Sequence, residues 1–193
     1  MKSSNLLKIS LFTLFSIMVI SGCSSNSSKA ALKNMPKWVK EIPSKEGFII
    51  VTGTGLSASY QQSINKAKLE AKAQLGDMVR SSVQANVQQV FDENLNTSGD
   101  NLDLFKSTIE STFSTLLENW KITKQEVTSA ELPNGKSGFK AYVLLEWDEG
   151  KAQKRALEKI KAKKEIYDAV KATDMIKEME DKVDTCCERY GCD

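Results

Sequence analysis

The stretch FKAYVLLEW, residues 139–147, has the clearest strand pattern in the chain. Its apolar residues recur at every second position, and this period of two places them on one face of a strand. They are Phe139, Ala141, Val143, Leu145 and Trp147. The turn signal Pro133-Asn134-Gly135-Lys136 precedes this stretch. Lys121 to Leu132, a less apolar segment, is therefore predicted to be the other strand of a hairpin.

Two helical patterns lie upstream of the hairpin. Residues 59–94 carry apolar side chains at spacings of three and four and contain no proline, which predicts a helix about 50 Å long. Ser59 and Gln62 form a capping box at its start. A loop over residues 94–101 separates it from a second predicted helix. The apolar stripe of that helix is Leu102, Phe105, Ile109, Phe113, Leu116, Leu117 and Trp120.

One further strand and one further helix complete the predicted order β-α-α-β-β-α. Phe48 to Thr52 is β-branched and aromatic and is followed by glycine, which predicts a strand that joins the hairpin antiparallel. Asp148 caps a last helix over residues 149–183. The sequence therefore predicts an α+β fold with a small antiparallel three-stranded sheet packed on long helices. We expect Phe139, Val143 and Trp147 to face the helix residues Ile64, Leu75, Phe105 and Phe113.

The N-terminus has the features of a lipoprotein signal. Apolar residues dominate positions 9–20, which as a helix span about 18 Å. A membrane core is about 30 Å thick, so this segment is interpreted as a signal-peptide core. Ile20-Ser21-Gly22-Cys23 then matches a lipobox, which predicts cleavage between Gly22 and Cys23 and lipidation of the Cys23 thiol. The alternative is an ordinary secretory signal with an incidental cysteine. Ser24 after the cysteine resembles the pattern for sorting to the outer membrane.

The predicted organisation has four parts. Residues 1–22 are the signal peptide, and 23–34 are a flexible polar tether. Residues 35–165 are the α+β domain, and 166–193 are a helical tail that contains cysteines.

Composition excludes several classes of function. The chain has no histidine, which rules out Ser-His-Asp and Cys-His nucleophile systems. Cleavage removes Lys2 and Lys8 from the 27 basic residues and leaves 25, equal to the 25 acidic residues. A net charge near zero gives no general attraction to nucleic acid. We expect no cofactor and no metal.

The tail holds three cysteines, Cys186, Cys187 and Cys192. Three thiols cannot all pair within one chain, and without histidine a closed zinc site needs an acidic ligand or a second chain. We favour a local disulfide to Cys192 that leaves one thiol free or pairs two chains.

Three further patterns suggest chemistry. Gly53-Thr54-Gly55-Leu56-Ser57-Ala58 fits a dinucleotide fingerprint, but the helix after it is too long for that fold, and we favour a glycine-rich strand end. Ser63 and Lys66 have the S-x-x-K spacing of penicillin-binding enzymes without the companion motifs. Residues 151–164 form a basic run, interpreted either as contact with anionic lipid or nucleic acid or, as we favour, as a solvated helix face.

Three segments together resemble the lipoprotein-20 family of small bacterial outer-membrane lipoproteins. They are Met35-Pro36-Lys37-Trp38-Val39, the strand end Thr52 to Gly55, and the alanine-rich helix start Ala67 to Leu75. The resemblance covers residues 35–150 and the lipobox, and it implies a dodecin-like α+β fold. Some relatives build discs or rings around the flagellar motor and others are surface antigens. The family has no established catalytic residues, so none are carried over. The tail after residue 165 departs from the family pattern.

These features predict a non-enzymatic outer-membrane lipoprotein that acts by self-association or by binding envelope or flagellar proteins. The alternatives are a surface-exposed antigen that binds host surfaces and an envelope enzyme that uses Ser63 and Lys66. A helix of about 50 Å is longer than a strand of about 20 Å can cover. We therefore expect part of its apolar stripe to form a homo-oligomer interface. The candidate residues are Val83, Val87, Val90 and Phe91.

Overall fold

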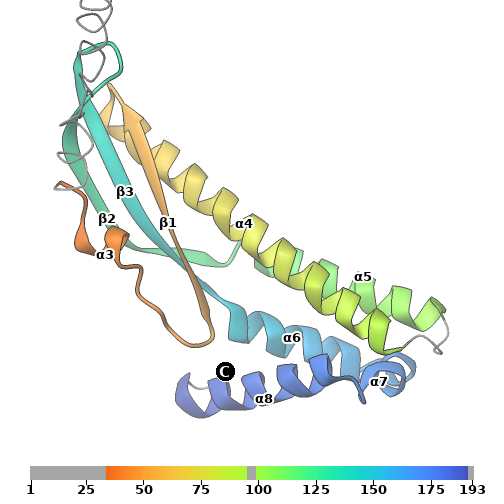
Figure 1. Cartoon of the computed structure of the whole chain (residues 1–193). Coiled ribbons are helices and arrows are strands. Elements are labelled where there is room, and N and C mark those ends of the chain that lie inside the picture. Colours follow the sequence, from red (N-terminus) through yellow and green to blue (C-terminus); the bar gives the residue numbers. More distant parts are fainter. Residues whose placement is uncertain (1–33, 95–98, 191–193) are drawn as a thin grey trace, which may run out of the picture. The chain divides into compact units, whose positions relative to one another are not determined.

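The computed structural model describes residues 34–94 and 99–190, and Pro36 to Asp193 form one compact unit (Figure 1). Cys23, Gly22 and Cys192 lie outside the described residues. The elements run in the order α3 (Lys37–Lys40), β1 (Phe48–Ser57), α4 (Tyr60–Glu93), α5 (Gly99–Leu116), β2 (Trp120–Glu131), β3 (Ser137–Asp148), α6 (Glu149–Lys161), α7 (Lys164–Val170) and α8 (Asp174–Tyr190). The fold is α+β, as the sequence predicted.

The three strands form one antiparallel sheet in the order β1-β3-β2. β3 is central, where Gly53 pairs with Val143 on one side and Trp120 pairs with Trp147 on the other. A register shift between Ile122 and Lys124 marks a β-bulge in β2. Residues 141 to 145 of β3 are all buried, so this strand is covered on both faces and not only on the face that the alternation predicted.

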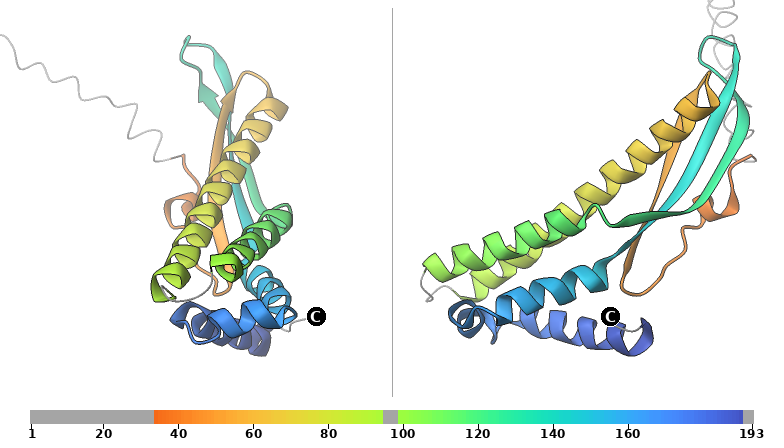
Figure 2. Two further views of the ribbon diagram at one scale, coloured as in Figure 1. Left: turned by 90° about the vertical axis from the view of Figure 1, so that its right-hand side faces the viewer. Right: turned by 180° about the vertical axis from the view of Figure 1, so that it is seen from behind.

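α4 lies across one face of the sheet and contacts both β1 and β3 (Figures 1 and 2). Two glycines of β1 let the helix come close. A Cβ on Gly53 would lie 2.1 Å from the Ala67 carbonyl oxygen, and a Cβ on Gly55 would lie 2.1 Å from that of Ser63. Glycine, which has no Cβ, is therefore the only residue type that fits at these two positions.

The second half of α4 is covered by the other helices and belongs to the core. α5 packs against α4, α6 and α7, and α8 packs against α6 and α4. Val83, Val87 and Val90 are at most 7% exposed, and Phe91 packs against the same core. The expectation that this stripe lacks a partner within one chain is therefore wrong, and its three valines are too buried to form an oligomer interface. The sheet indeed leaves them uncovered, but helices from the same chain cover them.

The expected tail is part of the same compact unit. In place of one helix over residues 149–183, the structure has three helices separated by turns at 162–163 and 171–173. These turns fold α8 back beside α6 (Figure 2). The side chains that α7 and α8 bury are Ile166, Val170, Met175, Ile176, Met179 and Val183. The predicted domain boundary at residue 165 is absent because these apolar side chains complete the core.

Two aromatic residues differ from their predicted places. Trp120 begins β2 rather than ending the second helix, and the Lys72 ammonium lies 4.3 Å from the centre of its ring. Phe139 is half-buried and packs edge-on against Tyr60 at 5.7 Å. The expected contact between Phe113 and Trp147 is present, with ring centroids 6.1 Å apart.

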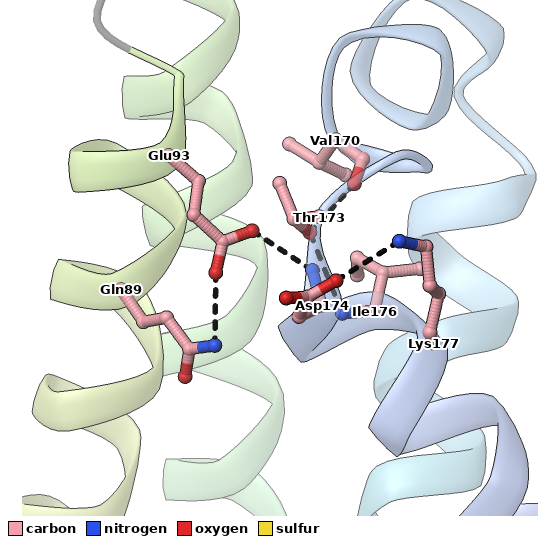
Figure 3. Close-up of polar contacts among 7 residues, drawn as sticks. All are labelled: Gln89, Glu93, Val170, Thr173, Asp174, Ile176 and Lys177. Atoms are coloured by element: carbon pink, nitrogen blue, oxygen red, sulfur yellow. Dashed lines mark hydrogen bonds and ion pairs between the residues drawn. The ribbon is translucent and has the colours of Figure 1, made fainter.

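A polar contact ties the end of α4 to the start of α8 (Figure 3). One carboxylate oxygen of Glu93 accepts the Asp174 backbone N–H at 2.8 Å, and the other accepts the Gln89 amide at 2.9 Å. The Asp174 N–H belongs to the first turn of α8, where backbone donors have no partner within the helix. Glu93 thus acts as an N-terminal cap supplied from 81 residues away in sequence.

Glu93→Ala should lower the free energy of unfolding by about 1 kcal/mol, the usual cost of losing a cap. Urea denaturation measures this difference. Asp92→Ala is the matched control, because within the described residues the hydrogen bond of Asp92 is to Gln88 of its own helix, and the change in stability should be less than about 0.5 kcal/mol. Equal effects of the two substitutions would contradict the capping role.

Candidate functional site

The glycine motif of β1 serves packing and does not form a nucleotide site. Gly53 and Gly55 lie inside the strand, and both face the backbone of α4 with no room for even a methyl group. The strand beside β1 is antiparallel, whereas a dinucleotide fold needs a parallel neighbour. The motif is structural, as we favoured, but it is not a strand end, because β1 continues through both glycines to Ser57.

Ser63 and Lys66 make separate contacts at the junction between β1 and α4. Ser63 is fully buried, and its hydroxyl donates to the Tyr60 carbonyl at 2.7 Å. The Lys66 ammonium donates to the Leu56 carbonyl at 3.1 Å. A nucleophile must meet its substrate, so this arrangement disfavours an enzyme that uses the two residues as a pair.

α4 also covers hydrogen-bonding groups along the outer edge of β1. The Glu70 carboxylate accepts the Thr54 backbone N–H at 2.8 Å and the Thr54 hydroxyl at 3.1 Å. With Lys66 on Leu56, two backbone groups of this edge are bonded to side chains of the same chain. Such covering opposes the addition of a strand from another molecule. These contacts could not be predicted from the sequence, because Glu70 belongs to no motif and the S-x-x-K spacing of Lys66 does not indicate a bond to the strand edge.

A small pocket surrounds Cys186 on α8. Cys187 is disulfide-bonded, whereas Cys186 has a free thiol. The pocket has a volume of about 290 Å³ and includes Gly47, Gly150 and Gln153. Burial raises the pKa of the Cys186 thiol, and the charges of Asp148 and Glu46 raise it further. A raised pKa keeps the thiol protonated and weakly nucleophilic, which favours a structural role.

A groove between α4 and α5 has a volume of about 320 Å³. Val79, Val83 and Phe113 contribute apolar surface to it, while Arg80 and Glu110 bring opposite charges. The groove lies where two helices of the same core pack together. Its lining residues do not indicate a particular class of ligand.

The basic run divides into paired and unpaired residues. The Lys154 ammonium lies 4.0 Å from Glu158, and that of Lys161 lies 2.7 Å from Glu180. The hydrogen bond to Glu180 raises the pKa of Lys161. Lys151, Arg155 and Lys159 are exposed and have no ion pair within residues 34–94 and 99–190. We call these three residues the basic stripe.

The N-terminal end of the basic stripe borders a pocket of about 410 Å³. Its lining joins the end of α5, the start of β2 and the start of α6. The charged and polar residues there are Asn119, Lys121, Asp148, Lys151 and Arg155. The Asp148 carboxylate accepts the Lys151 backbone N–H at 2.8 Å and so caps α6. Lys121 was not connected with the basic run in the sequence, because 30 residues separate it from Lys151.

No group of three or more residues that could ligate a metal occurs in the part of the chain that the structure describes. Within the same residues, every helix is too short or too polar to cross a bilayer. Comparison with models of known protein families, with curated proteins and with solved structures found no match to this chain.

Proposed function

We propose that this chain is a lipoprotein of the bacterial outer membrane, anchored through acylated Cys23, and that it acts without catalysis. It would work by association with itself or with envelope or flagellar-motor-associated proteins. The observation that carries this proposal is the lipobox Ile20 to Cys23 directly after a short apolar segment. Several acyl chains, at about 0.8 kcal/mol per buried CH₂, anchor a protein stably.

The contacts of the folded unit support a role in binding over one in catalysis. The glycine motif and the Ser63-x-x-Lys66 motif, which suggested nucleotide or acyl chemistry, both form contacts between α4 and β1 or within α4. Two exposed apolar side chains of α4, Leu69 and Met78, are nine residues apart and so point to opposite sides of the helix. Val83, Val87 and Val90 are buried within the chain, so self-association would use a different surface.

Cys23→Ala should prevent acylation and leave an uncleaved or soluble precursor in place of the normal membrane-anchored protein, because the thiol is the point of acyl attachment. Fractionation of cells and gel mobility measure both effects. Cys186→Ala is the matched control, since it removes another free thiol and should leave retention and mobility unchanged. Normal retention and mobility of the Cys23→Ala protein would contradict the proposal.

A further inference from the structure

The basic stripe is a local concentration of charge on a nearly neutral protein. Lys151, Arg155 and Lys159 follow at intervals of four residues, so their side chains lie along one side of α6. Like charges at this spacing destabilise a helix by about 0.2–0.5 kcal/mol per pair. Glu158 lies close to the stripe, but Lys154 on its flank is the residue that pairs with it.

Other lysines of the same run form ion pairs with acidic side chains, whereas among the described residues the three of the basic stripe do not. Lys161 contacts Glu180 of α8, an acid placed 19 residues further along the chain. No acid is placed in this way opposite Lys151, Arg155 or Lys159 in the described part of the chain. The solvated helix face that we favoured from sequence explains exposure, but it does not explain this difference between neighbouring cations.

The pocket at the end of the stripe adds one cation from strand β2, Lys121, and the hydrogen-bond donors of a side-chain amide. Lys121 and the Asn119 amide join Lys151 and Arg155 around a space of about 410 Å³. The acid there, Asp148, is engaged by the backbone of α6. A guanidinium with two ammonium groups suits the oxygens of a phosphate ester, which accept several hydrogen bonds at once.

We propose that the basic stripe and this pocket bind the phosphate groups of anionic phospholipids and so hold the folded unit against a membrane surface. This inference rests on the proposed function, because a lipid anchor keeps the unit within reach of headgroups and raises their effective concentration. Each cation near an anionic surface contributes attraction that falls off within the Debye length. The stripe supplies several such cations on one face although the mature chain has no net charge.

Vesicle sedimentation tests this proposal with the chain from residue 23 onward carrying Cys23→Ser. That protein keeps the whole compact unit and has no acyl chain. It should sediment with equal mixtures of phosphatidylcholine and phosphatidylglycerol, more strongly at low salt, and should not sediment with phosphatidylcholine alone. Lys151→Gln with Arg155→Gln should lower the partition coefficient by about 30-fold, and Lys159→Gln alone by about fivefold.

The matched control is Arg80→Gln with Lys106→Gln, which changes net charge equally at exposed positions elsewhere. It should change the partition coefficient by less than about twofold. Circular dichroism of each variant checks the fold. Absence of binding to anionic vesicles, or equal losses in the two double variants, would overturn the proposal. Displacement by inorganic phosphate but not by chloride at equal ionic strength would also overturn it, because the ligand would then be free phosphate. Since none of these proteins is acylated, failure here leaves the Cys23→Ala result unaffected.

Discussion

Gly55→Ala should destabilise the protein by about 3 kcal/mol or more, because the added methyl group would overlap backbone atoms of α4. The added Cβ would lie 2.1 Å from the Ser63 carbonyl oxygen and 2.5 Å from the Ala67 backbone nitrogen. Backbone atoms of a helix cannot rotate away as a side chain can. α4 would have to shift from β1, and the packing of Ala67 and Ala71 on the sheet would be lost. Thermal unfolding should show a fall of about 6–12 °C.

Gly76→Ala is the control that separates this steric effect from the general effect of replacing glycine. Gly76 lies within α4, and its added Cβ would meet only the Leu117 side chain at 3.9 Å. Alanine favours a helix over glycine by about 1 kcal/mol, so this variant should be more stable than the parent. The two substitutions are therefore expected to have opposite signs. A stable Gly55→Ala protein would show that α4 does not lie against β1 as described.

Phe113→Ala should lower the free energy of unfolding by about 3–5 kcal/mol. Phe113 is 4% exposed and joins α5 to the sheet through its contact with Trp147. The Trp147 indole N–H donates to the Leu116 carbonyl at 2.8 Å, so this tryptophan is held from two sides. Loss of the phenyl ring leaves a cavity that these constrained neighbours cannot fill. Urea denaturation gives the change directly.

Leu104→Ala on the same helix provides the comparison. Leu104 is 47% exposed, so its truncation should cost less than about 0.5 kcal/mol. A cost for Phe113→Ala no greater than that for Leu104→Ala would mean that α5 does not pack on β3.

Local patterns in the sequence predicted most of the elements correctly. The alternation in residues 139–147 located the central strand, and the cap at Ser59 located the start of α4 to within one residue. Asp148 was correctly predicted to cap the next helix. Each of these features depends on neighbouring residues, which is why sequence alone could show it.

The errors concern features that depend on residues far apart in the chain. No proline or glycine marks the turns at 162–163 and 171–173, which form because α7 and α8 can bury apolar side chains only by folding back. α5 and α8 both pack on α4, and so Val83, Val87 and Val90 are buried by helices that are distant from them or follow them along the chain. Trp120 was placed on a helix because its spacing continues the α5 stripe, although its partner is Trp147 of β3.

The basic stripe and its pocket could be predicted only in part, because they too depend on residues far apart in the chain. The basic run was apparent, but which of its cations are paired depends on Glu180 of α8. Lys121 joins the pocket through the sheet. By contrast, the lipobox is a linear signal that a peptidase recognises in an extended chain, so Cys23 needs no folded context to be predicted.

The intact mass of the protein extracted from bacterial membranes with detergent tests whether Cys23 is the acylated N-terminus. We expect a chain that lacks residues 1–22 and carries acyl groups on Cys23 as its first residue. Fragmentation should place the added mass on Cys23 and leave Cys186 unmodified. A chain of the full 193 residues, or one with an unmodified Cys23, would contradict this expectation.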